Sequence, residues 1–92
     1  NNVIDLDWSP DGNYIITIDV IINRINRFRF DPAATSASAI LTFVDALPGI
    51  NINASCIKWS KTDNLIAAAF GGTLEICSIN NTNTLVSLFS AT

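Results

Sequence analysis

The sequence predicts an all-β fold of two successive four-stranded antiparallel sheets. Three observations predict it: a repeat marked by Trp8 and Trp59, 51 residues apart, short segments rich in β-branched and aromatic residues, and turn residues between those segments. A repeat of this period is typical of architectures that stack similar units. We therefore divide the chain into two units, residues 1–48 and 49–92, with an insertion around residues 19–38 in the first.

The repeat is clearest at the start of each unit. Residues 4–16 align with residues 55–67 without a gap, and Trp, Ser, Asn and Ile are identical in register. Further along, residues 41–44 align with residues 86–89 at a shift of 45, so the first unit is the longer before its last segment. The two units are similar in plan and unequal in length.

In the first unit we expect strands at residues 3–9, 14–19, 25–31 and 39–45. The run Pro-Asp-Gly at residues 10–12 gives the first turn, because Pro presets φ and Gly tolerates a positive φ. The third strand is the least determined, since Asp19, Asn23 and Asn26 are competing turn residues. Alanines in residues 33–44 favour a helix, but the Ser and Thr content and the apolar end of this segment predict a loop that runs into a strand.

In the second unit we expect strands at residues 54–60, 65–70, 73–79 and 84–90. The pair Gly71 and Gly72 predicts a tight hairpin between the second and third of these. The Asn-rich run 80–83 predicts the next turn. Each strand is short enough for a small sheet.

The composition limits the classes of function. The chain of 92 residues is 49% hydrophobic and 14% charged, too apolar for a disordered chain and too often interrupted by polar residues for a membrane span. The net charge of −3 has the wrong sign for binding nucleic acid. There is no His, the usual general base and a common zinc ligand. We expect no catalytic site, no metal, no cofactor and no transmembrane segment.

The cysteines bear on the compartment. Cys56 and Cys77 are the two in the chain, and we expect free thiols because nothing else resembles a disulfide-stapled scaffold. Free thiols favour a reducing, cytoplasmic location. The chain starts at Asn1 with no Met and no charged-then-apolar leader, so we expect an excised or processed piece.

The strands lack the alternation of a sheet that has one face in water. Ile15, Ile16 and Ile18 fall on both faces of one strand, and residues 65–70 are apolar at every position. Each sheet therefore needs cover on both faces, which two sheets cannot give each other. A β-propeller meets this need, because each blade lies between two others.

Residues 6–15, Leu-Asp-Trp-Ser-Pro-Asp-Gly-Asn-Tyr-Ile, resemble the first two strands of a WD-repeat blade. Residues 73–79, Thr-Leu-Glu-Ile-Cys-Ser-Ile, are similar to the third strand of that family. Together the matches cover nearly the whole chain as two blades. The resemblance implies a larger or oligomerically closed β-propeller, completed by further blades of the same chain, a partner subunit or further copies. TolB-type propellers share the Trp-Ser-Pro-Asp-Gly run and are the competing assignment.

The chain also departs from the WD pattern. The Trp-Asp pair of the family would fall at Cys77 and Ser78 in the second unit and at Phe30 and Asp31 in the first, so neither unit keeps both residues. The Gly-His pair is absent, since the chain has no His. The hydrogen-bond network that those residues build in the family cannot form here.

Arg24, Arg27 and Arg29 are the one local concentration of charge. Strand parity places Arg27 and Arg29 on one side and the two intervening phenylalanines on the other. Since Arg can fork onto a carboxylate or phosphate, these three are the candidate protein-binding residues. The alternative is that they only solubilise an apolar hairpin.

The remaining patterns predict binding and not catalysis. Trp8 and Trp59 hold matching repeat positions, so we expect them to anchor the packing of blades. We predict a non-catalytic scaffold segment that interacts with other proteins and has no direct contact with nucleic acid. The alternative is a homo-oligomer whose copies close a ring and bind small ligands, such as sugars, between blades. An enzyme of propeller ancestry would need an appended catalytic domain.

Overall fold

Within the described residues, eight strands make up almost all of the regular structure. A computed structural model describes residues 3–19, 24–48 and 54–91. The strands form two four-stranded sheets, ordered β1-β2-β3-β4 and β5-β6-β7-β8, and every pairing is antiparallel. The predicted all-β class and the two antiparallel sheets are confirmed.

The first sheet follows the order of the chain. Its strands are β1 (Val3–Trp8), β2 (Tyr14–Asp19), β3 (Arg24–Phe30) and β4 (Leu41–Leu47). The β1–β2 turn bends at Gly12, whose φ of 76° suits a residue without Cβ, and the Ser9 N–H donates to the Tyr14 carbonyl across 2.9 Å. One helical turn, α1 (Ala37–Ile40), precedes β4 where we predicted a loop that passes into a strand at residue 39. The local alanines suffice for one turn, and the chain is extended from Leu41.

The second sheet repeats this plan. Its strands are β5 (Ala54–Trp59), β6 (Ile66–Phe70), β7 (Thr73–Ile79) and β8 (Leu85–Ala91). The predicted glycine hairpin joins β6 to β7, with Gly71 at a φ of 59°. A β-bulge lies between Arg27 and Phe28 in the β3–β4 pairing, and another between Ile76 and Cys77 in the β7–β8 pairing. These matching bulges show that the repeat includes the third and fourth strands.

Strand pairing corrects the alignment of the last strands by one residue. Leu41 pairs with Phe30 and Leu85 with Ile79, so the shift between the units is 44 here and not 45. The apolar ends of both units fit either alignment, and only the partner strand fixes the register. The other predicted strand ends agree with the structure to within two residues. Asn23, a competing turn residue, lies outside the described residues.

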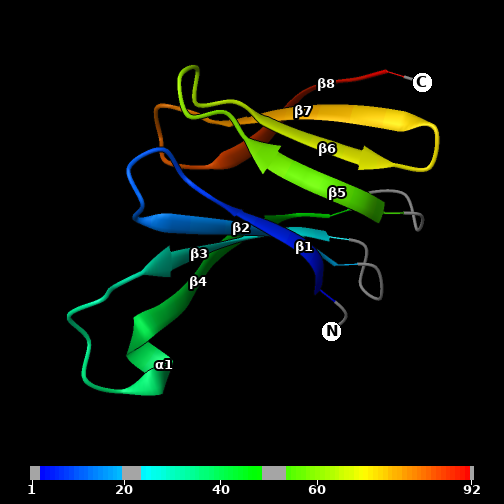
Figure 1. Cartoon of the computed structure of the whole chain (residues 1–92). Helices are drawn as coiled ribbons and strands as arrows, with labels where there is room; N and C mark the ends of the chain where they lie inside the picture. The colour runs from blue at the N-terminus through cyan, green and yellow to red at the C-terminus, as the bar shows by residue number, and fades with distance from the viewer. Residues whose placement is uncertain (1–2, 20–23, 49–53, 92) are drawn as a thin grey trace.

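The two sheets pack face to face, and Figure 1 shows them as two layers. Strand register places three fully buried isoleucines, Ile16, Ile18 and Ile25, on the inner face of the first sheet. The inner face of the second sheet contributes Ile57, Trp59, Ile66, Ala68, Phe70, Cys77 and Leu85. The two inner faces form one continuous core.

Each sheet has a second, outer face that nothing in the described structure covers. The outer face of the first sheet presents Leu6 and Phe43, each 50% exposed, and Trp8, 40% exposed. The outer face of the second presents Leu74 and Phe89, 45% and 56% exposed. Both sheets therefore present large apolar side chains on both faces, as the lack of alternation predicts.

Two carboxylates link β1 to β5, which lie side by side in Figure 1. Asp5 Oδ2 accepts the N–H of Ile57 at 2.9 Å, and Asp7 Oδ2 accepts the N–H of Trp59 at 2.7 Å. The edge of β5 is thus capped by side chains of the other sheet, which fixes how the sheets sit along their first strands. Across the described segments of the chain, no helix is long and apolar enough to cross a membrane.

Candidate functional site between the two sheets

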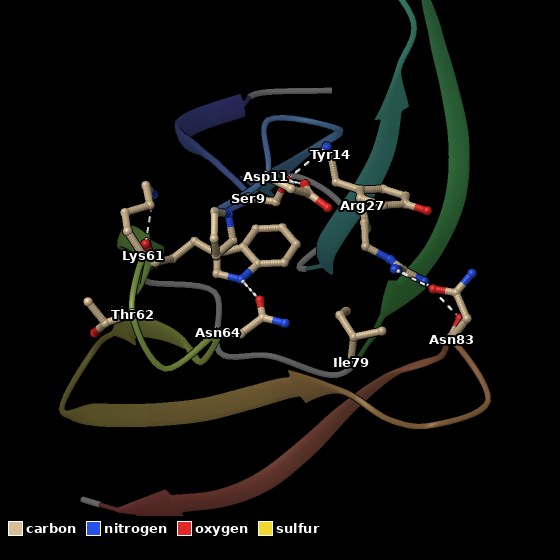
Figure 2. A pocket seen from close by; sticks show the side chains of 11 residues that line it. Ser9, Asp11, Tyr14, Arg27, Lys61, Thr62, Asn64, Ile79 and Asn83 are labelled. Atoms are coloured by element: carbon tan, nitrogen blue, oxygen red, sulfur yellow. Dashed lines mark hydrogen bonds between the residues drawn. The ribbon is translucent and has the colours of Figure 1, made fainter.

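A cavity of about 320 Å³ opens between the sheets, beside the β1–β2, β5–β6 and β7–β8 turns (Figure 2). Its lining combines two aromatic rings, two cationic side chains and several amides and hydroxyls. The lining residues are Ser9, Pro10, Asp11, Tyr14, Arg27, Trp59, Lys61, Thr62, Asn64, Ile79 and Asn83. A concave site with a few convergent polar groups is the usual form of a binding pocket.

Trp59 supplies the buried aromatic wall of this cavity. It ends β5, is 4% exposed, and donates its Nε1–H to Asn64 Oδ1 at 2.6 Å. Asn64 has a φ of 55°, a left-handed conformation that Asn adopts more readily than most residues. The β5–β6 turn therefore holds the amide that accepts the indole N–H, and Figure 2 shows Asn64 at the cavity.

Lys61 fastens the same turn to the first sheet. Its ammonium donates to Asp7 Oδ2 at 2.9 Å and to the carbonyls of Trp8 and Trp59, each at 2.7 Å. Burial alone would raise the pKa of Asp7, but the Trp59 N–H and the Lys61 ammonium lower it below its ordinary value. All three donor protons of Lys61 are thus used within the protein.

Arg27 crosses the cavity as a buried clip between the sheets. Its Nε and Nη2 donate to the two carboxylate oxygens of Asp45 at 2.8 and 2.9 Å. Nη1 and Nη2 also donate to the side-chain and backbone oxygens of Asn83 at 3.0 and 2.9 Å. The guanidinium lies 5.1 Å from the centre of the Tyr14 ring. One arginine therefore joins β3, β4 and the β7–β8 turn.

Asp45 receives a further donor from the second sheet. Its Oδ2 accepts the Leu85 N–H at 2.9 Å. Burial raises the pKa of Asp45, yet the hydrogen bonds from Arg27 and Leu85 lower it by more, so that it lies below its ordinary value. The carboxylate is ionised at neutral pH and completes the charge pair.

Asp11 and Ser9 lock the β1–β2 turn at the rim. The Ser9 hydroxyl donates to Asp11 Oδ1 at 2.7 Å, and the same oxygen accepts the Asn13 N–H at 2.9 Å. These bonds lower the pKa of Asp11 below its ordinary value. Several polar groups of the cavity are thus engaged in hydrogen bonds within the protein. A ligand in the cavity would bind through the lining groups that these bonds leave free.

The three predicted arginines do not form one exposed edge. Register confirms that Arg27 and Arg29 share a face, since they pair with Ile16 and Tyr14. Arg29 is exposed, whereas Arg27 is 1% exposed and presents no surface for a partner. Arg24 is half-buried on the outer face of the first sheet, 5.8 Å from the centre of the Phe43 ring. A protein-binding role stays a prediction for Arg24 and Arg29.

Sequence reasoning missed the partners of Arg27. Asp45 is 18 residues away and Asn83 is 56 residues away, in different strands and turns. The local sequence gave little sign of these contacts, because an isolated Asp predicts a solvated acid and an Asn-rich run predicts a turn. Only the pairing of β3 with β4, and of one sheet with the other, brings these groups together.

The cysteines lie on opposite faces of the second sheet. Both are free thiols, Cys56 exposed and Cys77 buried. Burial, and then the nearby charge of Glu75, raises the pKa of Cys77 to about 12. In the part of the chain that the structure describes, no three metal-binding side chains gather in one place.

Comparison with known proteins identifies a similar fold. No family model matches the sequence, and no curated protein matches it. Among solved structures, the chain is similar to a functionally unknown protein from Desulfotomaculum acetoxidans DSM 771, with a TM-score of 0.77 and 21% sequence identity over 96% of this chain. The match covers 26% of that protein's chain, which is thus nearly four times as long as the matched segment. At this identity the likeness shows the fold alone.

Proposed function

We propose that the chain forms two consecutive blades of a WD-repeat-like β-propeller and acts as a non-catalytic scaffold segment in protein–protein interaction. The observation that carries this proposal is the use of the faces: each sheet packs on one face and is left apolar on the other. In a propeller every sheet is covered on both faces, so these outer faces are the places for neighbouring blades.

The contact between the sheets supports the same proposal, because it can be repeated. Trp59 and Ile66, buried on the inner face of the second sheet, correspond to Trp8 and Ile15 on the outer face of the first. A sheet placed before β1 in the same orientation would cover Trp8 as the first sheet covers Trp59. A contact of this head-to-tail kind generates a ring when its rotation closes.

The length of the structural neighbour fits this architecture. A chain nearly four times as long as the matched pair of sheets has room for seven or eight such sheets, within the roughly four to eight blades of propellers. The partners of this chain would then be further blades and the proteins that bind the assembled surface, where the exposed Arg29 is a candidate contact. The free thiols fit a reducing compartment, and we propose the cytoplasm.

Hydrophobic-dye binding and sedimentation test whether the outer faces need cover. We expect the isolated chain to bind bis-ANS, and the double variant Leu74→Ser, Phe89→Ser to bind less, because it removes exposed apolar surface from the second sheet. Ala33→Ser with Ala39→Ser, at exposed positions outside the sheets, is the control and should not change dye binding. A chain that sediments as one copy, melts cooperatively and binds no dye contradicts the proposal.

Ligand binding between the sheets is the second candidate function. The cavity favours it, since the Tyr14 and Trp59 rings and the Asn83 amide suit a small polar ligand such as a sugar. Titration with mono- and disaccharides, followed by NMR, should shift the signals of Tyr14 and Asn83. Signals that stay in place across the panel remove this candidate.

A further inference from the structure

A hollow on the outer face of the first sheet contains three buried polar atoms that lack a partner. It measures about 270 Å³ and is lined by Val3, Thr17, Asp19, Arg24, Asn26, Phe28 and Phe43. Thr17 is 6% exposed and Asn26 is 4% exposed, so these two form the floor. Within the described residues, Thr17 Oγ1, Asn26 Oδ1 and Arg24 Nε are the buried side-chain atoms that make no hydrogen bond.

The hollow differs in this respect from the cavity between the sheets. There Arg27, Lys61, Asn64 and Asp11 are all engaged by other groups of the protein. The hollow is smaller, but in the described structure Thr17 Oγ1, Asn26 Oδ1 and Arg24 Nε within it make no hydrogen bond. A buried polar group without a hydrogen bond is strongly unfavourable once water is excluded, so whatever covers the hollow must supply the missing partners.

At the equivalent position of the second sheet, the buried polar side chain finds its hydrogen-bond partners within the same sheet. Register matches Thr17 with Ala68 and Asn26 with Glu75. The Glu75 carboxylate accepts hydrogen bonds from the hydroxyls of Ser87 and Ser90 in the neighbouring strand.

In the first sheet, the places of these two serines are taken by Phe43 and Ala46, which have no polar side-chain atom. The first sheet therefore cannot complete its own polar floor.

The chemistry of the three atoms defines the missing group. Asn26 Oδ1 needs a donor, Arg24 Nε needs an acceptor, and the Thr17 hydroxyl can be either. A carboxylate would serve Arg24 but would lie near the buried Asp19, and an ammonium would lie near Arg24. A neutral group with both a donor and an acceptor, a carboxamide or a hydroxyl, meets all three needs.

The size of the surface identifies the source of that group. The apolar rim of the hollow continues over Leu6, Trp8 and Leu41, all at least 40% exposed, which a small ligand in the hollow would leave in water. The matching face of the second sheet is covered by a sheet. We propose that the outer face of the first sheet docks a further β-sheet that brings a carboxamide or hydroxyl onto Thr17, Asn26 and Arg24, and that this sheet is not a second copy of the chain. The inference rests on the proposed function, in which further sheets cover this chain.

A second copy of the chain would not supply the missing partners, because it would cover the hollow with the outer face of its second sheet. The outer face of the second sheet carries Ala67, Ala69, Leu74, Ile76 and Phe89, and its polar residues are Lys58 and Ser78. Lys58 holds the place of Asp7, which bonds to Trp59, and Ser78 that of the exposed Arg29. Neither is therefore placed to reach Thr17 and Asn26 in such a stack. Stacked as the two sheets of the chain are stacked, this face would seal the three polar atoms without a partner. The polar floor thus discriminates against closure of a ring from identical copies.

Self-association of the 92-residue chain tests the discrimination. The double variant Thr17→Val, Asn26→Leu removes the floor's polar atoms at nearly constant volume. We expect its association constant, from sedimentation equilibrium, to exceed that of the wild type at least about 10-fold. Thr35→Val with Asn81→Leu makes the same replacements at exposed positions and should leave the constant unchanged. Equal constants for wild type and floor variant, or a wild-type chain that closes into a defined ring, overturn the inference.

A reciprocal variant tests the chemistry of the missing group. Leu74→Gln places a carboxamide on the exposed outer face of the second sheet, so its folding does not depend on repacking the core. We expect it to associate more tightly than the size-matched Leu74→Met, and to lose this advantage when combined with the floor variant. Equal association of the Gln and Met variants contradicts the inference. Dye binding by the wild type reports separately whether the outer faces are open, so a failure here is distinguishable from a failure of the proposed function.

Discussion

Trp8 and Trp59 show how strongly the burial of a side chain, and hence its contribution to stability, depends on the neighbouring sheet. They hold the same place in the repeat, but Trp59 is 4% exposed between the sheets and Trp8 is 40% exposed on an outer face. We expect Trp59→Ala to lower the free energy of unfolding by about 3–5 kcal/mol as a core truncation. Trp8 keeps an edge-to-face contact with Phe30, with ring centroids 5.1 Å apart, and Trp8→Ala should cost only about 1 kcal/mol. Urea denaturation of both variants checks this difference, and equal losses contradict it.

Arg27 and Arg29 make a second matched pair at the residue scale. Removing Arg27 leaves the partly buried Asp45 carboxylate with the Leu85 N–H but without its charged partner, and removes the guanidinium donors of the Asn83 oxygens. We expect Arg27→Ala to destabilise the chain by about 3 kcal/mol. Arg29 is exposed, so Arg29→Ala should change stability by no more than about 0.5 kcal/mol. Thermal and urea melts of the two variants measure the contrast, and a mild Arg27→Ala would show that the clip does not hold the sheets together.

At the scale of elements, three aspartates from the first sheet hold the strands of the second. Asp5 and Asp7 cap β5, and Asp45 caps the start of β8. Each accepts a backbone N–H that would otherwise be unpaired at a strand edge. Carboxylates thus join the two sheets on the side of β1 and β5 and on the side of β4 and β8, in addition to the apolar core.

These carboxylates predict a loss of stability in acid. The pKa values of Asp7 and Asp45 lie below the ordinary 3.8 in the folded chain, so their contribution is complete above that value and is lost as the pH falls through the lower, folded pKa. We expect the unfolding free energy to fall as the pH drops below 3.8, and to fall less steeply in Asp45→Asn. Urea melts over a pH series measure both slopes, and parallel slopes contradict the assignment to Asp45.

The same scale shows what the sequence could predict. Strand positions follow from local signals, β-branched runs and Gly or Pro turns, so β2 and β7 have the predicted ends. The register of β4 and β8 depends on partner strands, and there the alignment was wrong by one residue. The site was harder still, because Arg27 and Asn83 meet only after the sheets have packed. A local pattern does not encode that contact.

For the whole molecule, the outer faces decide whether the chain is complete by itself, and the cysteines can report on this. Cys56 lies on the outer face of the second sheet and is exposed, while Cys77 lies on the inner face, buried, with a pKa of about 12. We expect a maleimide to label Cys56 rapidly in the folded chain, and Cys77 only when the chain unfolds, because burial and the scarcity of thiolate both slow the reaction. In an assembly that covers the outer face of the second sheet, Cys56 should be protected as well. Single-site labelling followed by mass spectrometry measures the rates, with Cys56→Ser and Cys77→Ala to assign each site. Rapid labelling of Cys56 within such an assembly would show that this face stays open, and that the stacking of sheets ends there.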